Sequence, residues 1–339
     1  MAMHSIPDTK CVVRNPTQTI IRCNADEIMV RWGSRSRTSH QLKDDHNRGV
    51  LADLVERLAL PADIAQISAW YPHVDPVHIE EILDSLLRHH VVVELAQAEG
   101  AFLELGLQLG SRSLLAQCSV GVVGDGAIAR AVINDLADAG VGSFAVLDIR
   151  RALRDHGAAL VTGEAEIEWL DSDGDAELAD LFGEADVVCV AGDEPDLAML
   201  YRCNALALES QTPWLMAHAD GPEIIVGPLF RPYETACFND YDTQEEAART
   251  HRMDHLFYKA ALVRDGFERR PIPRFMAEQA GSMATLALVQ ALTGGASFLE
   301  GAVLRTDLER MEVVREMVLR MPRCPACIGG RPDYRHPFL

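Results

Sequence analysis

The fold is decided by one stretch, Val122-Val123-Gly124-Asp125-Gly126-Ala127-Ile128-Ala129-Arg130. It has the form G-x-G-x-x-A and lies between an apolar run of strand length and a helical run that continues to Ala139. The first glycine permits a tight turn, the second lets the backbone approach a phosphate, and the small third residue allows close helix–strand packing. The N–H groups at the start of such a helix face an anion. The stretch therefore predicts the first strand–turn–helix unit of a doubly wound α/β domain.

The chain downstream alternates between strand and helix patterns. We expect strands at 143–147, 185–191, 213–217, 224–226, 303–308 and 311–318, and helices at 195–208 and 275–292. Strands that alternate with helices of this length indicate a parallel sheet with helices on both faces. Asp148 ends the second strand, where a carboxylate can accept hydrogen bonds from ribose hydroxyls. Gly124, Gly126 and Asp148 are thus candidate nucleotide-site residues; the alternative is a glycine turn that persists without nucleotide binding.

The first 95 residues have a different pattern. Two β-rich runs, 17–23 and 27–32, are separated by the turn-forming cluster Asn24-Ala25-Asp26, which predicts a hairpin. Helical runs follow at 50–58, 62–70 and 77–87, and then Val91-Val92-Val93 supplies a closing strand. We therefore predict a winged-helix-like module in residues 1–95, a packed connector in 96–113 and the α/β domain in 114–339.

Composition limits the class of protein. The formal net charge of −20 over 339 residues repels nucleic acid and anionic lipid, so we expect neither as a partner. Neither a secretory apolar segment nor 18 consecutive apolar residues occur, and a cytoplasmic protein is expected. In a reducing compartment the eight cysteines are expected to be buried thiols or metal ligands.

Several motifs occur in the order found in ThiF/MoeB-like domains, and the chain resembles that ubiquitin-activating-enzyme-like superfamily. The motifs are Gly124-Asp125-Gly126, the run 187–193, Gly227-Pro228-Leu229 with Thr235-Ala236-Cys237, the helix around Ala280-Gly281-Ser282, and Cys324-Pro325-Ala326-Cys327. With a leading winged-helix module, the chain looks most like two peptide-modifying groups. These are the microcin-C-type adenylating enzymes and the ocin-ThiF-like, leader-binding partners of YcaO cyclodehydratases, which form azolines (thiazole and oxazole precursors) in ribosomally synthesised peptides. The resemblance also implies a homodimer.

Catalytic members of the superfamily resemble one another in residues that this sequence mostly lacks. They have a second acid after the ribose carboxylate, an Asn-x-x-Arg-Gln segment, a phosphate-binding Lys and an Asp for magnesium. Here Arg150 stands at the second acid, no Lys occurs between 44 and 258, and only Asp193 fits the magnesium position. Losing these groups removes on the order of several kcal/mol of transition-state stabilisation. Arg150, Arg151 or Arg154 could substitute with different geometry, but we do not expect this chain to use ATP and Mg²⁺.

The zinc site of the resembled family joins two C-x-x-C pairs. This sequence keeps Cys324 and Cys327, while the upstream pair reads Cys237-Phe238-Asn239-Asp240. Because carboxylate oxygen also ligates zinc, the resemblance implies a structural Zn²⁺ site made of Cys237, Asp240, Cys324 and Cys327. The alternative is a site that has lost zinc and retains three buried thiols.

The amino-terminal module is locally basic. Residues 1–43 hold seven Lys and Arg against three Asp and Glu, a reversal that suggests an acidic partner. In the resembled leader-recognition modules, a peptide adds as a strand to the hairpin edge and packs against the third helix. The resemblance places that site on Ile28, Val30, Arg31, Trp32, Ile79, Ile82, Leu83 and Leu86. Core packing is the alternative explanation for each apolar residue in this set.

The function expected from the resemblance is that of a leader-peptide-binding partner in the biosynthesis of a ribosomally synthesised, post-translationally modified peptide, a class that includes antibiotics. Such a protein delivers the precursor to a YcaO-type cyclodehydratase and is not itself the catalyst. One alternative is an ATP-dependent adenylating enzyme for a peptide or carrier-protein terminus, with Asp193 holding magnesium. A second alternative is a winged-helix regulator fused to a nucleotide-sensing domain.

Overall fold

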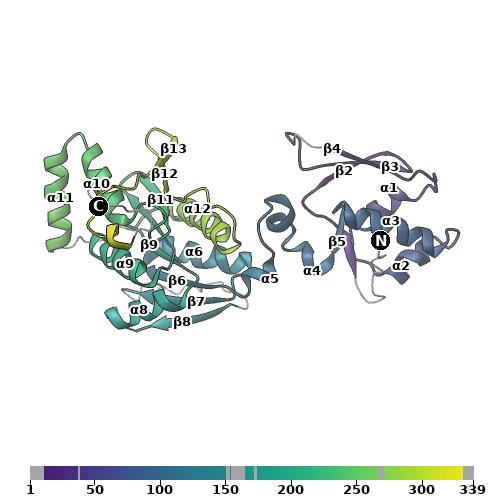
Figure 1. The fold of residues 1–339 in the computed structure, drawn as a ribbon. Coiled ribbons are helices and arrows are strands. Elements are labelled where there is room, and N and C mark those ends of the chain that lie inside the picture. The colour runs from purple at the N-terminus through teal and green to yellow at the C-terminus, as the bar shows by residue number, and fades with distance from the viewer. Residues whose placement is uncertain are drawn as a thin grey trace, which may run out of the picture. The chain divides into compact units, whose positions relative to one another are not determined.

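The computed structural model describes residues 11–36, 39–149, 153, 165–171, 174–265 and 271–330 (Figure 1). The chain divides into two compact units, Met1–Ser111 and Arg112–Leu339. Each unit has its own hydrophobic core.

The first unit combines two small antiparallel sheets with three helices. One sheet pairs β1 (Val12–Arg14) with β5 (Val92–Glu94); the other has the order β2 (Thr19–Asn24), β3 (Glu27–Arg31), β4 (Ser39–Lys43). The helices are α1 (Leu51–Arg57), α2 (Ile64–Trp70) and α3 (Pro76–Arg88), followed by the short α4 (Leu95–Ala98) and a π-helical turn, η1 (Phe102–Gly106). Asp63 and Asp75 begin α2 and α3, because their carboxylates accept backbone N–H groups of the first turn.

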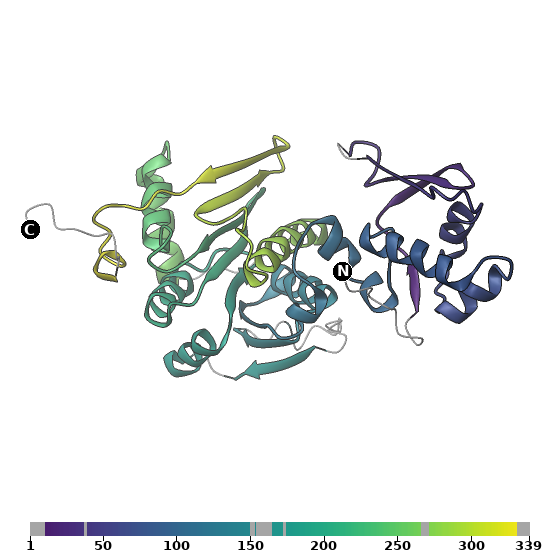
Figure 2. The same cartoon turned by 45° about the vertical axis from the view of Figure 1, so that its right-hand side comes forward.

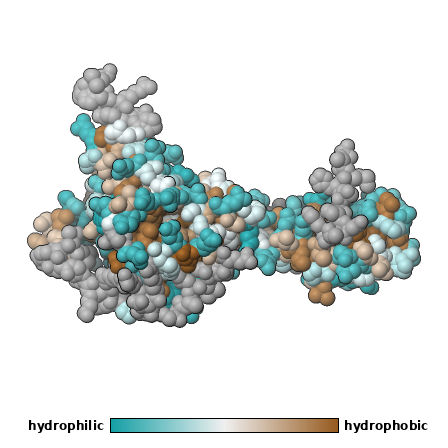
Figure 3. Space-filling view, turned by 90° about the horizontal axis from the view of Figure 1, so that it is seen from below, coloured by the Kyte–Doolittle hydropathy of each residue, from teal (hydrophilic) through white to brown (hydrophobic). Residues whose placement is uncertain are grey.

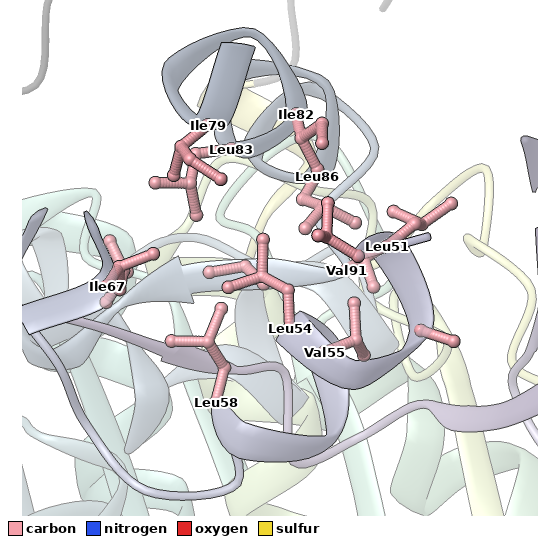
Figure 4. Close-up of a cluster of buried hydrophobic side chains, with 14 of the residues drawn as sticks. Leu51, Leu54, Val55, Leu58, Ile67, Ile79, Ile82, Leu83, Leu86 and Val91 are labelled. Carbon is pink, nitrogen blue, oxygen red and sulfur yellow. The ribbon is translucent and has the colours of Figure 1, made fainter. Parts of the chain in front are cut away.

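Apolar residues at helical spacing on α1, α2 and α3 form the core of this unit (Figure 4). The side chains labelled there are Leu51, Leu54, Val55, Leu58, Ile67, Ile79, Ile82, Leu83, Leu86 and Val91. The expected hairpin is in fact part of a three-stranded sheet. β4 was not predicted because four of its five residues are polar and exposed, so its strand conformation comes from pairing with β3 rather than from an apolar pattern.

The second unit is built on an eight-stranded sheet of order β13-β12-β11-β10-β9-β6-β7-β8. Its five parallel strands are β6 (Ser119–Gly124), β7 (Ser143–Asp148), β8 (Glu166–Leu170), β9 (Val187–Gly192) and β10 (Trp214–Asp220). The antiparallel strands are β11 (Glu223–Phe230), β12 (Ala302–Asp307) and β13 (Glu312–Met317). The parallel order β8-β7-β6-β9-β10 is that of a doubly wound fold, which confirms the predicted fold class.

Helices cover this sheet. They are α5 (Arg112–Leu115), α6 (Gly126–Ala139), α8 (Asp175–Glu184), α9 (Leu197–Ser210), α10 (Phe238–Ala248), α11 (Arg252–Asp265) and α12 (Arg274–Leu292). Helix α12 lies along α6, and α8 packs with α9 (Figure 2). Right-handed crossovers place α6 and α9 on opposite faces, because the chain reverses its direction across the sheet between β7 and β9.

The surface mixes residue types. Figure 3 shows one face, on which hydrophobic residues are scattered among hydrophilic ones. Within the described ranges, no helix combines the length and the apolar character needed to cross a bilayer.

A substitution at Gly124 tests how closely β6 and β9 approach each other. Its φ is +149°, and a Cβ there would lie 1.7 Å from the backbone oxygen of Ala191 on the neighbouring strand β9. We predict that Gly124→Ala lowers the free energy of unfolding by about 3 kcal/mol, because β6 and β9 must separate. Gly183→Ala is the matched control, since no atom lies within 4 Å of its added Cβ on α8, and alanine stabilises helices by up to about 1 kcal/mol. Urea unfolding of both variants measures the difference; equal midpoints would show that the strands do not approach this closely.

Candidate functional site

The carboxyl ends of β6 and β9 meet where the sheet changes direction, which is where ligands bind in doubly wound folds. Gly124 ends β6, and Gly126 begins α6 with a φ of +87°. A hollow of about 310 Å³ lies here, and its lining includes Gly124, Gly192 and Glu194. The structure thus places the predicted glycine turn where doubly wound folds bind the phosphate of a nucleotide.

Asp193 occupies the amino-terminal end of α6. One of its carboxylate oxygens accepts hydrogen bonds from the backbone N–H of Ala127 (2.8 Å) and of Ile128 (3.0 Å). A Cβ on Gly126 would lie 2.5 Å from the carboxyl carbon of Asp193, so glycine is required for this contact. These N–H groups are the ones that would bind a phosphate. The residue expected to hold magnesium therefore caps the helix, where its negative charge opposes the binding of another anion.

The predicted ribose carboxylate also has an internal partner. Asp148 is buried, and its carboxylate accepts a hydrogen bond from the backbone N–H of Leu153 at 3.0 Å. It therefore holds Leu153, five residues further along the chain. Arg150, Arg151 and Arg154, the suggested substitutes for the missing lysine, lie outside the described residues.

The predicted metal ligands converge. One ligand atom from each of Cys237, Asp240, Cys324 and Cys327 lies within 4.8 Å of the others, and all four residues are buried. The sulfurs of Cys237 and Cys324 are 3.5 Å apart, and the sulfur of Cys327 is 3.8 Å from a carboxylate oxygen of Asp240. A tetrahedral zinc ion with Zn–S bonds of about 2.3 Å separates its ligand atoms by roughly 3.7 Å. The set therefore fits zinc.

Local structure explains how these ligands meet. Cys237 and Asp240 lie in the first turn of α10, where the Cys237 backbone N–H donates to the Asp240 carboxylate. Cys324 and Cys327 lie in the turn that leads to the short helix η2 (Ile328–Gly330). A zinc ion would thus tie the carboxyl-terminal segment to α10.

Without a bound cation, the surroundings of Cys237 and Cys324 favour the neutral thiol. A hydrogen bond with Cys327 and burial raise the pKa of Cys237, and burial raises that of Cys324. A bound zinc ion converts such thiols to thiolates. Burial raises the pKa of Cys189 to about 12 and is the largest cause that raises the pKa of Cys203 to about 12, and both are buried thiols, as expected.

The apolar residues predicted to contact a peptide lie in the core of the first unit. Their exposed fractions are 5% or less for Ile28, Val30, Ile79, Ile82, Leu83 and Leu86. In addition, β3 pairs with β2 on one side and with β4 on the other. The prediction that the strand from Ile28 offers a free edge, and that these six side chains face a ligand, is therefore wrong. The alternative explanation, core packing, accounts for all six residues. An apolar pattern in the sequence predicts that a side chain is buried, but it does not predict whether the protein core or a bound peptide covers it.

The two remaining residues of that set have local partners. The guanidinium of Arg31 donates to the backbone oxygens of Ser34 and Ser36. A Cβ on Gly106 would lie 3.3 Å from the Trp32 ring, so Trp32 packs against η1. Arg31 and Trp32 thus order the segments around β3.

One free edge of the three-stranded sheet belongs to β4. The backbone N–H of Asp44 donates to Asp26 at 2.8 Å, and hydrogen-bonded pairs alternate along an antiparallel ladder. The backbone groups of Ser39, Gln41 and Lys43 therefore point away from β3, and among the described residues they have no neighbouring strand.

Two ion pairs tie this sheet and the segment that follows it to the helices. Arg48, between β4 and α1, pairs with Glu81 of α3 at 3.0 Å, and Arg22 of β2 pairs with Glu56 of α1 at 3.3 Å. The sheet therefore packs as part of the first unit while its β4 edge has no partner strand among the described residues. Sequence reasoning missed this strand, and Leu42 is its only apolar residue.

Comparison with known proteins gives matches among solved structures. A crystal structure of E. coli MccB with succinimide has 14% identity and a TM-score of 0.56, and the match covers 94% of this chain and 99% of that one. The heterocyclase TruD has 18% identity and a TM-score of 0.61 over 94% of this chain and 43% of its own. A heterocyclase in complex with substrate and cofactor has 16% identity and a TM-score of 0.63, covering 94% and 40%. No family model and no curated protein matches the chain.

These likenesses confirm the ThiF/MoeB-like fold that the motif order predicted. At such identities they show the fold alone. The match to MccB spans almost the whole of both chains, whereas this chain spans less than half of either heterocyclase.

The cysteine cluster yields a prediction about metal content. We expect the purified protein to contain one zinc ion per chain, and Cys327→Ser to lower both the zinc content and the unfolding temperature, because a ligand is lost. Cys23→Ser is the control, since that thiol is exposed on β2. Elemental analysis and thermal unfolding provide the measurements. Zinc-free protein that unfolds at the same temperature with and without added zinc would contradict the assignment.

Proposed function

We propose that this protein captures the leader of a ribosomally synthesised precursor peptide and delivers it to a YcaO-type azoline-forming cyclodehydratase. The observation that carries the proposal is the free edge of β4, in a unit with its own core. The fold shared with heterocyclases, one of them determined in complex with substrate and cofactor, supports the proposed pathway.

Strand addition is the recognition mode that this edge suits. The outward N–H and C=O groups at positions 39, 41 and 43 can pair with an extended peptide, which gives affinity through the backbone. Specificity would come from exposed side chains on the strand, among them His40 and Lys43. The strand is short and polar, and such edges resist pairing with further copies of themselves.

A role in presentation is favoured over catalysis by this chain. Asp193 takes the phosphate-binding N–H groups of α6, and the sequence has no lysine between 44 and 258. When this protein holds the leader, the concentration of the rest of the precursor near the partner enzyme rises. This protein need not catalyse any reaction to have that effect.

The second candidate function is ATP-dependent adenylation of a peptide or carrier-protein terminus. It is favoured by the likeness to MccB, which has been determined with ATP and, separately, with N-formylated MccA. That function requires Asp193 to leave the helix end and hold magnesium.

The β4 edge can be tested with paired proline variants. Gln41→Pro removes an outward N–H group from β4 without breaking a bond to β3, so we predict at least about tenfold weaker binding of the leader peptide. Arg22→Pro is the control, because by the same alternation it removes an outward N–H group from the opposite edge, on β2. The probe is a fluorescently labelled leader from the precursor encoded beside this gene, followed by anisotropy. If both variants weakened leader-peptide binding equally, the peptide would not bind at the β4 edge.

Deletion of residues 1–111 gives a coarser test. The remaining unit should not bind the leader peptide at all. Undiminished binding by residues 112–339 would overturn the proposed function.

A further inference from the structure

We propose that the second unit contains a binding site for a small primary amine with an apolar body, in the hollow that β10, α10 and α11 enclose beside His218. The hollow is open to solvent, and about 520 Å³ of space lies in it when that open part is counted. This site belongs to the second unit and the β4 edge to the first, and the proposal does not rest on the function proposed above.

His218 is a buried polar side chain that faces two hollows. It lies on β10 between Gly192 of β9 and Ile225 of β11, and it is 7% exposed. Its ring makes no hydrogen bond to any residue in the described part of the chain, yet it lines both the 310 Å³ hollow and the 520 Å³ hollow. A ring that has no partner among the described residues and lines a hollow can form its hydrogen bonds with water or with a ligand held there.

The protonation state of His218 limits which ligand it can bind. Burial lowers the pKa of His218 to about 4. The ring is therefore neutral at neutral pH, with one nitrogen that accepts and one that donates. A neutral imidazole can accept a hydrogen bond from an ammonium group, which a protonated one cannot.

Two of the carboxylates that line the hollows are available to a ligand. Asp220 lines the larger hollow and Glu194 the smaller, and neither forms an ion pair within the described ranges. Burial raises the pKa of Tyr258, and the charges of Asp220 and Glu194 raise it further, so both carboxylates act on the same rim.

The cations around the larger hollow are already paired. The Lys259 ammonium contacts Asp242 and lies 3.9 Å from Glu246. The Arg249 guanidinium lies 3.5 Å from Glu245. The charge left for a ligand is therefore negative, which favours a cation over an anion.

The floor of the larger hollow is apolar, with Leu200, Ile225 and Phe238 among its lining residues. A ligand whose ammonium group meets Asp220 and His218 can therefore place an aliphatic or aromatic body on this floor. Those two requirements define the ligand class as an amine joined to an apolar group.

The test compares two probes of matched shape and opposite charge. Tyramine carries an ammonium group on a phenol ring, and 3-(4-hydroxyphenyl)propionate carries a carboxylate on the same ring. Isothermal titration of the full chain should detect tyramine binding and no binding of the propionate. Asp220→Asn should weaken tyramine binding by about tenfold or more, because a charge-assisted hydrogen bond is lost. Asp180→Asn, at an exposed position on α8, should leave it within about twofold.

A second measurement keeps the result independent of any loss of folding. The ring carbon signals of His218, assigned through His218→Gln, should shift on addition of tyramine. Absence of tyramine binding, equal binding of both probes, or equal affinities in wild type and Asp220→Asn would overturn the site. Leader-peptide binding should be unchanged in Asp220→Asn, which separates failure of this proposal from failure of the proposed function.

Discussion

The contact between the Asp193 carboxylate and the first N–H groups of α6 sets the chemistry of the second unit. A helix end offers unpaired N–H groups and a partial positive charge, which must be met by an anion, by water or by a side chain. Here the chain supplies its own anion at 2.8 and 3.0 Å. The glycine turn is still required, because the close approach of β6 to β9 leaves no room for a side chain at Gly124. The N–H groups that the turn would offer to a phosphate are instead bonded to the Asp193 carboxylate.

On the proposed function, peptide capture and scaffolding fall to different parts of the chain. The first unit has the open strand edge, and its core does not depend on the second unit. The second unit holds a broad sheet and a cluster of three cysteines and an aspartate that fits zinc and would fix the carboxyl-terminal segment to α10. A presenting protein needs these two properties, namely an accessible capture edge and a rigid body to which it is joined.

Sequence patterns predicted the parts of the fold that local physics determines. The G-x-G-x-x-A stretch located β6 and α6, the helical run at 77–87 located α3, and the cysteine spacing identified a cluster whose members do meet. The polar strand β4 and the polar helix α10 were missed, because their conformations come from pairing and ion pairs rather than from apolar periodicity.

The role of Asp193 could not be predicted for a different reason. It depends on a contact across 66 residues of sequence, between Asp193 and Ala127. A sequence motif identifies the residue at a position but not what it contacts. Only the fold shows whether this aspartate contacts a metal ion or the end of a helix. The same reasoning applies to Ile79 and Leu83. Their spacing correctly predicted a helix with an apolar face, but that face contacts the core of the first unit and not a peptide.

The most direct test of the account is ATP–pyrophosphate exchange by the isolated full chain, with magnesium and the precursor peptide present. We predict no exchange above the protein-free background, because the anion site is occupied by Asp193 and the phosphate-binding lysine is absent. Exchange that depends on the peptide and disappears in Asp193→Asn would contradict the account and identify the protein as an adenylating enzyme.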